Sequence, residues 1–131
     1  MASELRVNTL KDAAGNNSVG MEYVANGSAK AWVNASHSAI TDSLNTSSFT
    51  DNSTGNHTVG ISSAMGNTTY GITGFARSDG SNTGYAYTFT ANIADIKTTS
   101  AFQFSSRYQG GGGGSVYDSI ENGFNFHGDL A

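Results

Sequence analysis

The chain has 131 residues, no cysteine, no proline and a formal net charge of −4 that comes from six basic and ten acidic residues. This length predicts one domain with a single core and is too short for two. The basic residues are too scattered to hold a phosphate backbone, so we expect no nucleic-acid partner, and the lack of cysteine excludes a disulfide framework.

The sequence also argues against a membrane protein. No stretch approaches the roughly 18 apolar residues of a membrane span. Met1–Glu4 leads into an alternating segment without the apolar core of a signal peptide. We therefore expect synthesis in a reducing cytoplasm and no membrane insertion.

Residues 1–18 are predicted to form an extended arm. Leu5, Val7 and Leu10 supply its apolar side chains before turn-forming residues break the pattern. A lone strand cannot bury its own apolar face, so the arm should dock on the body, a sister subunit or another protein. After the arm, residues 21–26 favour a short helix that ends at Gly27.

The next segment, residues 29–36, alternates small apolar residues with larger or polar ones and predicts a strand. Ala31, Val33 and Ala35 share one face, whereas Trp32 lies on the opposite face. Trp32 is predicted to anchor the core or an interface, because large aromatic side chains are usually buried. A surface tryptophan that binds a ligand is the alternative.

A hairpin is predicted where turn-forming residues 51–56 separate two alternating segments. Its second strand points His57, Val59 and Ile61 the same way. Residues 38–45 are expected to be a loop, and Gly74 suggests a bulge in the following strand. The strands predicted up to this point cover residues 29–36, 46–51, 57–63 and 68–76.

In the last third of the chain, strands are predicted at 85–91 and 98–108, followed by a final hairpin or bent strand at 116–127. Two glycine-containing connections accompany them: residues 78–84 precede the first of these strands, and residues 110–114 follow the second. Phe102 and Phe104 share one face of their strand, and Phe124 and Phe126 should face inward. The candidate receptor-contact loop consists of Asp79, Asn82, Tyr85 and Tyr87, because sugars stack on aromatic rings while Asn and Asp bind hydroxyls. The alternating tyrosine rings are more simply interpreted as core residues, which leaves the polar tip loop as the better contact surface.

Seven or eight short strands without a sustained helical period indicate an all-β protein. We predict that residues 19–131 form one antiparallel β-sandwich or jelly-roll.

No residue pattern predicts catalysis, a cofactor or a metal site. The carboxylates fall mostly in turns and no pair stands out as the acids of a glycosidase. His37, His57 and His127 lack chelate spacing, although a three-fold axis could gather three copies of His57 or His127. The run from Asp51 to Gly55 lacks the later glutamate of a calcium loop. We therefore expect no enzyme.

Several segments resemble one family. They are the AKAWVN run at 29–34, the D-S-x-N-x-S-S-x-T-D-N run at 42–52, the GNHTV run at 55–59, Met65 and Tyr70, and the two ends, residues 5–15 and 126–129. Together they resemble short tail-fibre-like virion proteins of tailed bacteriophages from cyanobacteria and other aquatic bacteria. Residues 78–115 match nothing in that family.

The resemblance implies a non-enzymatic virion protein that is made in the host cytoplasm and forms a homo-oligomer, most simply a trimer. It would be a tail fibre or its host-contacting head, with other virion proteins and a host surface glycan as partners. The alternative is a capsid decoration protein whose arm clamps coat subunits. A depolymerase module is a third possibility.

Overall fold

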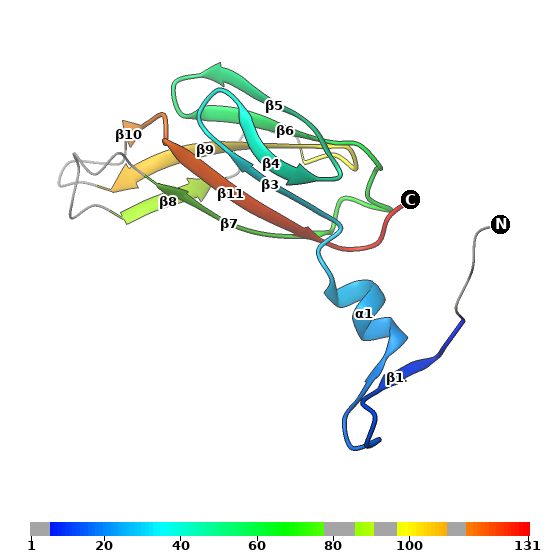
Figure 1. The fold of residues 1–131 in the computed structure, drawn as a ribbon. Helices are drawn as coiled ribbons and strands as arrows, with labels where there is room; N and C mark the ends of the chain where they lie inside the picture. Colours follow the sequence, from blue (N-terminus) through cyan, green and yellow to red (C-terminus); the bar gives the residue numbers. More distant parts are fainter. Residues whose placement is uncertain (1–5, 78–85, 91–96, 110–114) are drawn as a thin grey trace.

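Two antiparallel sheets pack face to face in the computed structural model, which describes residues 6–77, 86–90, 97–109 and 115–131 (Figure 1). The all-β sandwich predicted from the sequence is confirmed. The four-stranded sheet has the order β4 (Ile40–Leu44), β3 (Ala31–Ala35), β11 (Glu121–His127) and β7 (Gly71–Arg77). The five-stranded sheet consists of β5 (Thr46–Ser53), β6 (Asn56–Ile61), β8 (Ala86–Thr90), β9 (Ala101–Gln109) and β10 (Ser115–Val116), with β5 at one edge.

The core lies between the sheets and follows the alternation read from the sequence. The buried set contains Ala31, Val33, Ala35, Val59, Ile61, Met65, Tyr70, Phe102, Phe104, Phe124 and Phe126. The inward prediction for Phe124 and Phe126 is confirmed. The faces predicted to be shared within the other strands prove to be the inner ones, whereas Met65 and Tyr70 were not predicted to be core residues. The rings of Phe104 and Phe124 meet across the sheets at a centroid distance of 4.4 Å. Burial of these aromatic side chains supplies the main favourable term for folding.

Residues 40–44 form strand β4, although the sequence pattern predicted a loop there. Pairing with β3 explains the difference, because hydrogen bonds to that strand hold β4 extended, with Trp32 opposite Leu44. The chain then passes directly into β5, which belongs to the other sheet. The single residue Asn45 makes this corner with a φ of 54°. Its side chain donates to the carbonyls of Lys30 (3.0 Å) and Ser63 (3.1 Å) and accepts from the Ser63 amide (2.7 Å). Asn tolerates this left-handed conformation better than most residues do.

The predicted bulge at Gly74 is wrong, because β7 pairs with β11 in unbroken register from Gly71 to Arg77. Gly74 lies opposite Phe124, and a Cβ on Gly74 would approach the Phe124 ring to 2.4 Å. On the outer face Gly123 lies opposite Phe75, and a Cβ there would approach the Phe75 ring to 2.3 Å. Each phenylalanine ring thus covers the glycine of the facing strand, which explains both glycines without a bulge.

Of the two alternatives predicted over residues 116–127, a hairpin or a bent strand, the hairpin is wrong. Strand β10 pairs with β9 in the five-stranded sheet, whereas β11 pairs with β3 and β7 in the other. Residues Tyr117–Ile120 therefore cross between the sheets and, together with the β5–β6 turn, close one end of the sandwich, which we call the turn end. The C-terminus lies at the opposite end, which we call the arm end (Figure 1).

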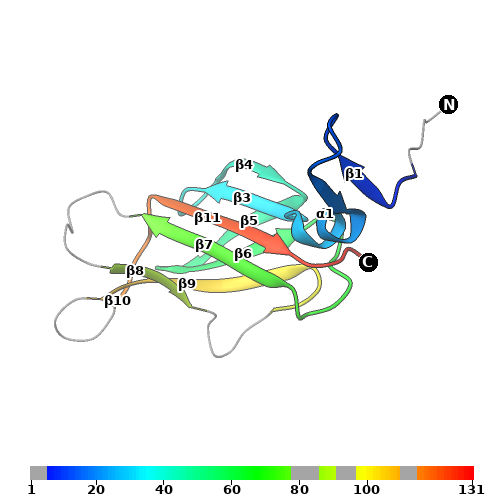
Figure 2. The same cartoon turned by 90° about the horizontal axis from the view of Figure 1, so that it is seen from below.

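The described part of the N-terminal segment forms a small structure outside the sandwich. Strands β1 (Thr9–Lys11) and β2 (Ser18–Gly20) make an antiparallel hairpin, and α1 (Met21–Gly27) follows directly. The predicted short helix is thereby confirmed. Both views show the hairpin projecting away from the sandwich, with α1 between them (Figures 1 and 2). The sequence prediction ended the arm at residue 18, whereas β2 and α1 also lie outside the sandwich, so from here the arm means residues 6–28.

Candidate functional site

The arm exposes most of its apolar side chains. Leu10 is 42% exposed, Val19 is 38% exposed and Tyr23 is 69% exposed, while α1 has no buried residue. Of the three residues predicted to attach the protein, Leu10 is exposed on β1, Val7 is half-buried, and Leu5 lies outside the described residues. An isolated hairpin of two strands is marginally stable in water, so this arrangement fits a segment that gains stability by docking.

A surface hollow of about 300 Å³ lies on the hairpin itself. Leu10 and Val19, which face each other in the β1–β2 ladder, line it together with polar neighbours. The hollow is thus at the arm end, on the same element as the exposed apolar residues. A partner side chain could be received there.

The outer face of the four-stranded sheet holds Trp32. Its side chain is half-buried and lies in register between Leu44 of β4 and Asn125 of β11, opposite the core. Trp32 is therefore not part of the buried core, and its role as an interface anchor stays a prediction. Phe75, 49% exposed, adds a second aromatic ring to this face.

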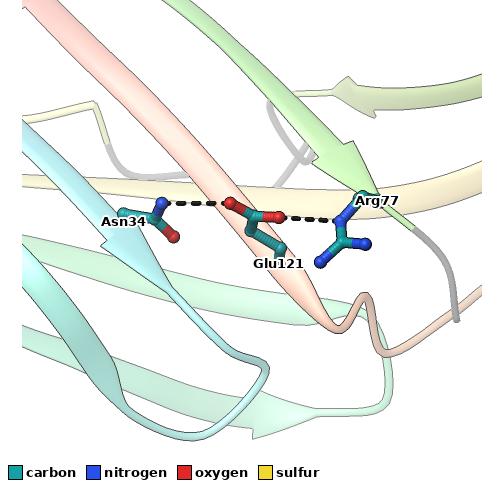
Figure 3. A network of polar contacts seen from close by, with 3 residues as sticks. All are labelled: Asn34, Arg77 and Glu121. Carbon is teal, nitrogen blue, oxygen red and sulfur yellow. Dashed lines mark hydrogen bonds and ion pairs between the residues drawn. The ribbon is translucent and has the colours of Figure 1, made fainter.

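A polar network joins three strands on this face (Figure 3). Asn34 Nδ2 donates to Glu121 Oε1 at 3.0 Å, and Arg77 Nε donates to Glu121 Oε2 at 2.7 Å. These hydrogen bonds, that from Asn34 foremost, lower the pKa of Glu121. The network fixes Asn34 and Arg77 at the surface, where an exposed ion pair adds little to stability.

The candidate receptor-contact loop falls largely outside the description. Asp79, Asn82 and Tyr85 lie outside the described residues, whereas Tyr87 lies in β8 in register with Tyr108 of β9. The residues that flank this segment, Arg77 and Ala86, end β7 and begin β8 at the turn end.

Three ionisable side chains converge at the turn end. Asp51 comes from β5, His57 from β6 and Asp118 from the segment that precedes β11, and each offers a ligand atom within 4.8 Å of the others. His57 is fully buried between the rings of Phe49 and Phe104, at centroid distances of 5.2 and 5.4 Å. Burial lowers the pKa of His57, and the two carboxylates oppose this shift only in part.

Further buried polar groups lie at this end. Ser106 Oγ donates to Asn122 Oδ1 at 3.1 Å and so links the two sheets. Within the described chain, Ser119 Oγ, Asn122 Nδ2 and both ring nitrogens of His57 are buried without a hydrogen-bond partner. Such groups are rare in folded proteins, so each of them calls for a physical explanation.

Sequence reasoning missed this convergence. The hairpin prediction already set Asp51 near His57, because the two residues flank one turn and pair directly across it. Asp118, however, is 61 positions beyond His57, and only the crossing of residues 117–120 between the sheets brings it to them.

Comparisons with known proteins give no match: no family model, no curated protein and no solved structure resembles this chain significantly. Within the described residues no helix is long and apolar enough to cross a membrane. The function must therefore be argued from the chain itself.

Proposed function

We propose that this protein is a non-enzymatic structural component of a tailed-phage virion, a short tail fibre or its host-contacting head, that assembles as a homo-oligomer through its arm. The observation that carries the assembly role is the set of apolar side chains that the arm leaves exposed beside the sandwich. The resemblance of residues 29–70 to tail-fibre-like proteins supports the virion role.

The physical reason is the free energy available from covering the arm. Fully burying a leucine or valine side chain contributes about 1.5–3 kcal/mol. Leu10, Val19 and Tyr23 are at least one-third exposed in the single chain. In a symmetric oligomer this contribution recurs in every subunit, so a trimer would gain it three times.

The arrangement also gives the protein two distinct ends. The arm and the C-terminus lie at one end, and the β5–β6 turn lies at the other (Figure 1). An assembly held by its arms would direct the turn ends outward. The flanks of the segment that contains Asp79, Asn82 and Tyr85 are at that end, which agrees with a receptor-contact role for this segment and for Tyr87.

The test replaces the exposed apolar residues of the arm and measures the oligomeric state. Wild-type protein should sediment as an oligomer, for which a trimer is expected, and the variant Leu10→Ser/Val19→Ser/Tyr23→Ser should sediment as a monomer with an unchanged circular dichroism spectrum. The control is Ile120→Ser/Leu130→Ser, which removes two exposed apolar side chains of the sandwich body and should leave the oligomer intact.

A monomeric wild type at concentrations near 100 μM, or an oligomer that survives the triple substitution, would overturn the assembly proposal. Immunogold labelling of particles would separate a tail fibre from a capsid decoration protein. Binding to intact host cells would support the host-contacting head, whereas release of reducing ends from host polysaccharide would show a depolymerase and contradict the non-enzymatic assignment.

A further inference from the structure

The group Asp51, His57 and Asp118 has the composition of a cation site. It offers one imidazole nitrogen and two carboxylate oxygens, all within 4.8 Å of one another. Donors bound to one zinc ion at about 2.0–2.2 Å lie roughly 3–4 Å apart. Small side-chain rotations would therefore bring these three donors onto a common centre.

The buried imidazole is an independent sign that a ligand is missing. His57 has no exposed surface, and neither ring nitrogen makes a hydrogen bond of good geometry among the described residues, although the backbone of His37 lies near enough to favour the charged ring weakly. A buried polar group without a partner is costly, and a metal ion that accepts the nitrogen lone pair removes that cost. The neutral form of imidazole is the one that binds metal.

The backbone around the group is held in place. The Gly55 amide donates to Asp118 Oδ1 at 2.6 Å, the Ser106 amide donates to the Gly55 carbonyl at 2.7 Å, and the Tyr117 amide donates to the Ser106 carbonyl at 3.1 Å. Gly55 has a φ of +67°, and a Cβ on it would lie 2.6 Å from the Tyr117 nitrogen. The turn is thus tied to β9 and to the segment that carries Asp118. Such outer contacts orient metal ligands.

We propose that Asp51, His57 and Asp118 bind one divalent first-row transition-metal ion, with Zn²⁺ as the representative case and water completing the coordination. Imidazole with carboxylate suits zinc and its neighbours, whereas Ca²⁺ and Mg²⁺ prefer oxygen ligands alone. The ion would join β5 and β6 to the segment that leads into the other sheet. It would therefore fasten the turn end, independently of any assembly through the arm.

The experiment uses the tag-free full chain, freed of metal with a chelator. Titration with Zn²⁺ by calorimetry should show one ion per chain, and saturating Zn²⁺ should raise the midpoint of thermal unfolding by about 5 °C, since a ligand that binds only the folded state stabilises it. Co²⁺ should give a visible absorption band that Zn²⁺ abolishes by displacement.

Asp51→Asn and Asp118→Asn should each weaken Zn²⁺ binding by at least about tenfold, because each removes a charged ligand. Asp51 is exposed, so Asp51→Asn tests the site even if a change at the buried His57 prevents folding. The matched controls are Asp42→Asn, an exposed aspartate on β4, and His127→Gln; both should bind Zn²⁺ as the wild type does. The proposal fails if the wild type binds Zn²⁺ with a dissociation constant above about 1 mM. It also fails if Asp51→Asn and Asp118→Asn both bind Zn²⁺ with the affinity of the wild type.

Discussion

The sandwich and the arm treat apolar side chains in opposite ways. In the sandwich, Phe104 and Phe124 are buried, and their rings meet between the two sheets. In the arm, Leu10 and Tyr23 meet water on a segment that stands beside the body. The comparison teaches that exposure in the single chain separates the apolar residues that stabilise the fold from those that we propose for association.

The largest expected effect comes from the centre of the sandwich. Phe104→Ala should lower the free energy of unfolding by about 3–5 kcal/mol, because it leaves a cavity among Phe49, Phe102 and Phe124. In the arm, Tyr23→Ala should change it by less than about 0.5 kcal/mol in the monomer. Urea unfolding followed by circular dichroism measures both, and equal losses would contradict the division between core and arm.

The corner between the sheets should rank next. Asn45→Ala removes three hydrogen bonds and places alanine at a φ of 54°, so we expect a loss of about 2–3 kcal/mol. Asn125→Ala, at an exposed position of β11, is the control and should be nearly neutral. Thermal unfolding measures both variants. If Asn45→Ala lowered the stability as little as Asn125→Ala does, the corner would not depend on the Asn45 side chain.

A glycine of the sandwich and a glycine of the arm should also respond differently to substitution by alanine. Gly74→Ala forces a methyl group against the Phe124 ring and the Gly123 carbonyl, and should cost about 1–3 kcal/mol. In the arm, Gly27→Ala meets open space and should be neutral or slightly stabilising, since alanine favours helix over glycine. Chemical denaturation of the two variants tests this difference, and a destabilised Gly27→Ala would show unexpected packing around α1.

The smallest effect concerns the surface network. Because Asn34 and Arg77 lower the pKa of Glu121, the network stabilises the folded state above the ordinary glutamate pKa, and this contribution disappears as the pH falls through the lowered pKa. Carboxyl-carbon NMR should place the Glu121 titration below its usual range. Asn34→Ala should raise that pKa, and an unchanged titration would show that the hydrogen bond does not persist in solution.

The strands that bury one face were predictable because their apolar residues recur at every second position. Alternation placed Val33 on one face with its small apolar neighbours and Phe126 inward, and both are buried. Strand β4 was missed because its polar residues, Thr41 to Ser43, look like a loop until pairing with β3 supplies their register. The bulge predicted at Gly74 was wrong because a single sequence does not distinguish a glycine at a bulge from a glycine covered by an aromatic ring of the neighbouring strand.

The turn-end group was only half predictable. Local hairpin geometry brings Asp51 to His57, but Asp118 reaches them through a crossing whose path depends on which sheet β11 joins. No short-range pattern contains that choice. Loop-borne sites built by long-range topology are therefore the part of a β-sandwich that sequence reasoning is least able to foresee.

The edge strand β5 has one further consequence. Its residues, TSSFTDNS, include a single apolar side chain, Phe49, which packs against the core. Unpaired sheet edges rich in apolar residues are templates for amyloid, and polar, charged edges suppress such growth. The β5 edge should therefore not template fibril growth, which leaves ordered self-association to other surfaces of the protein.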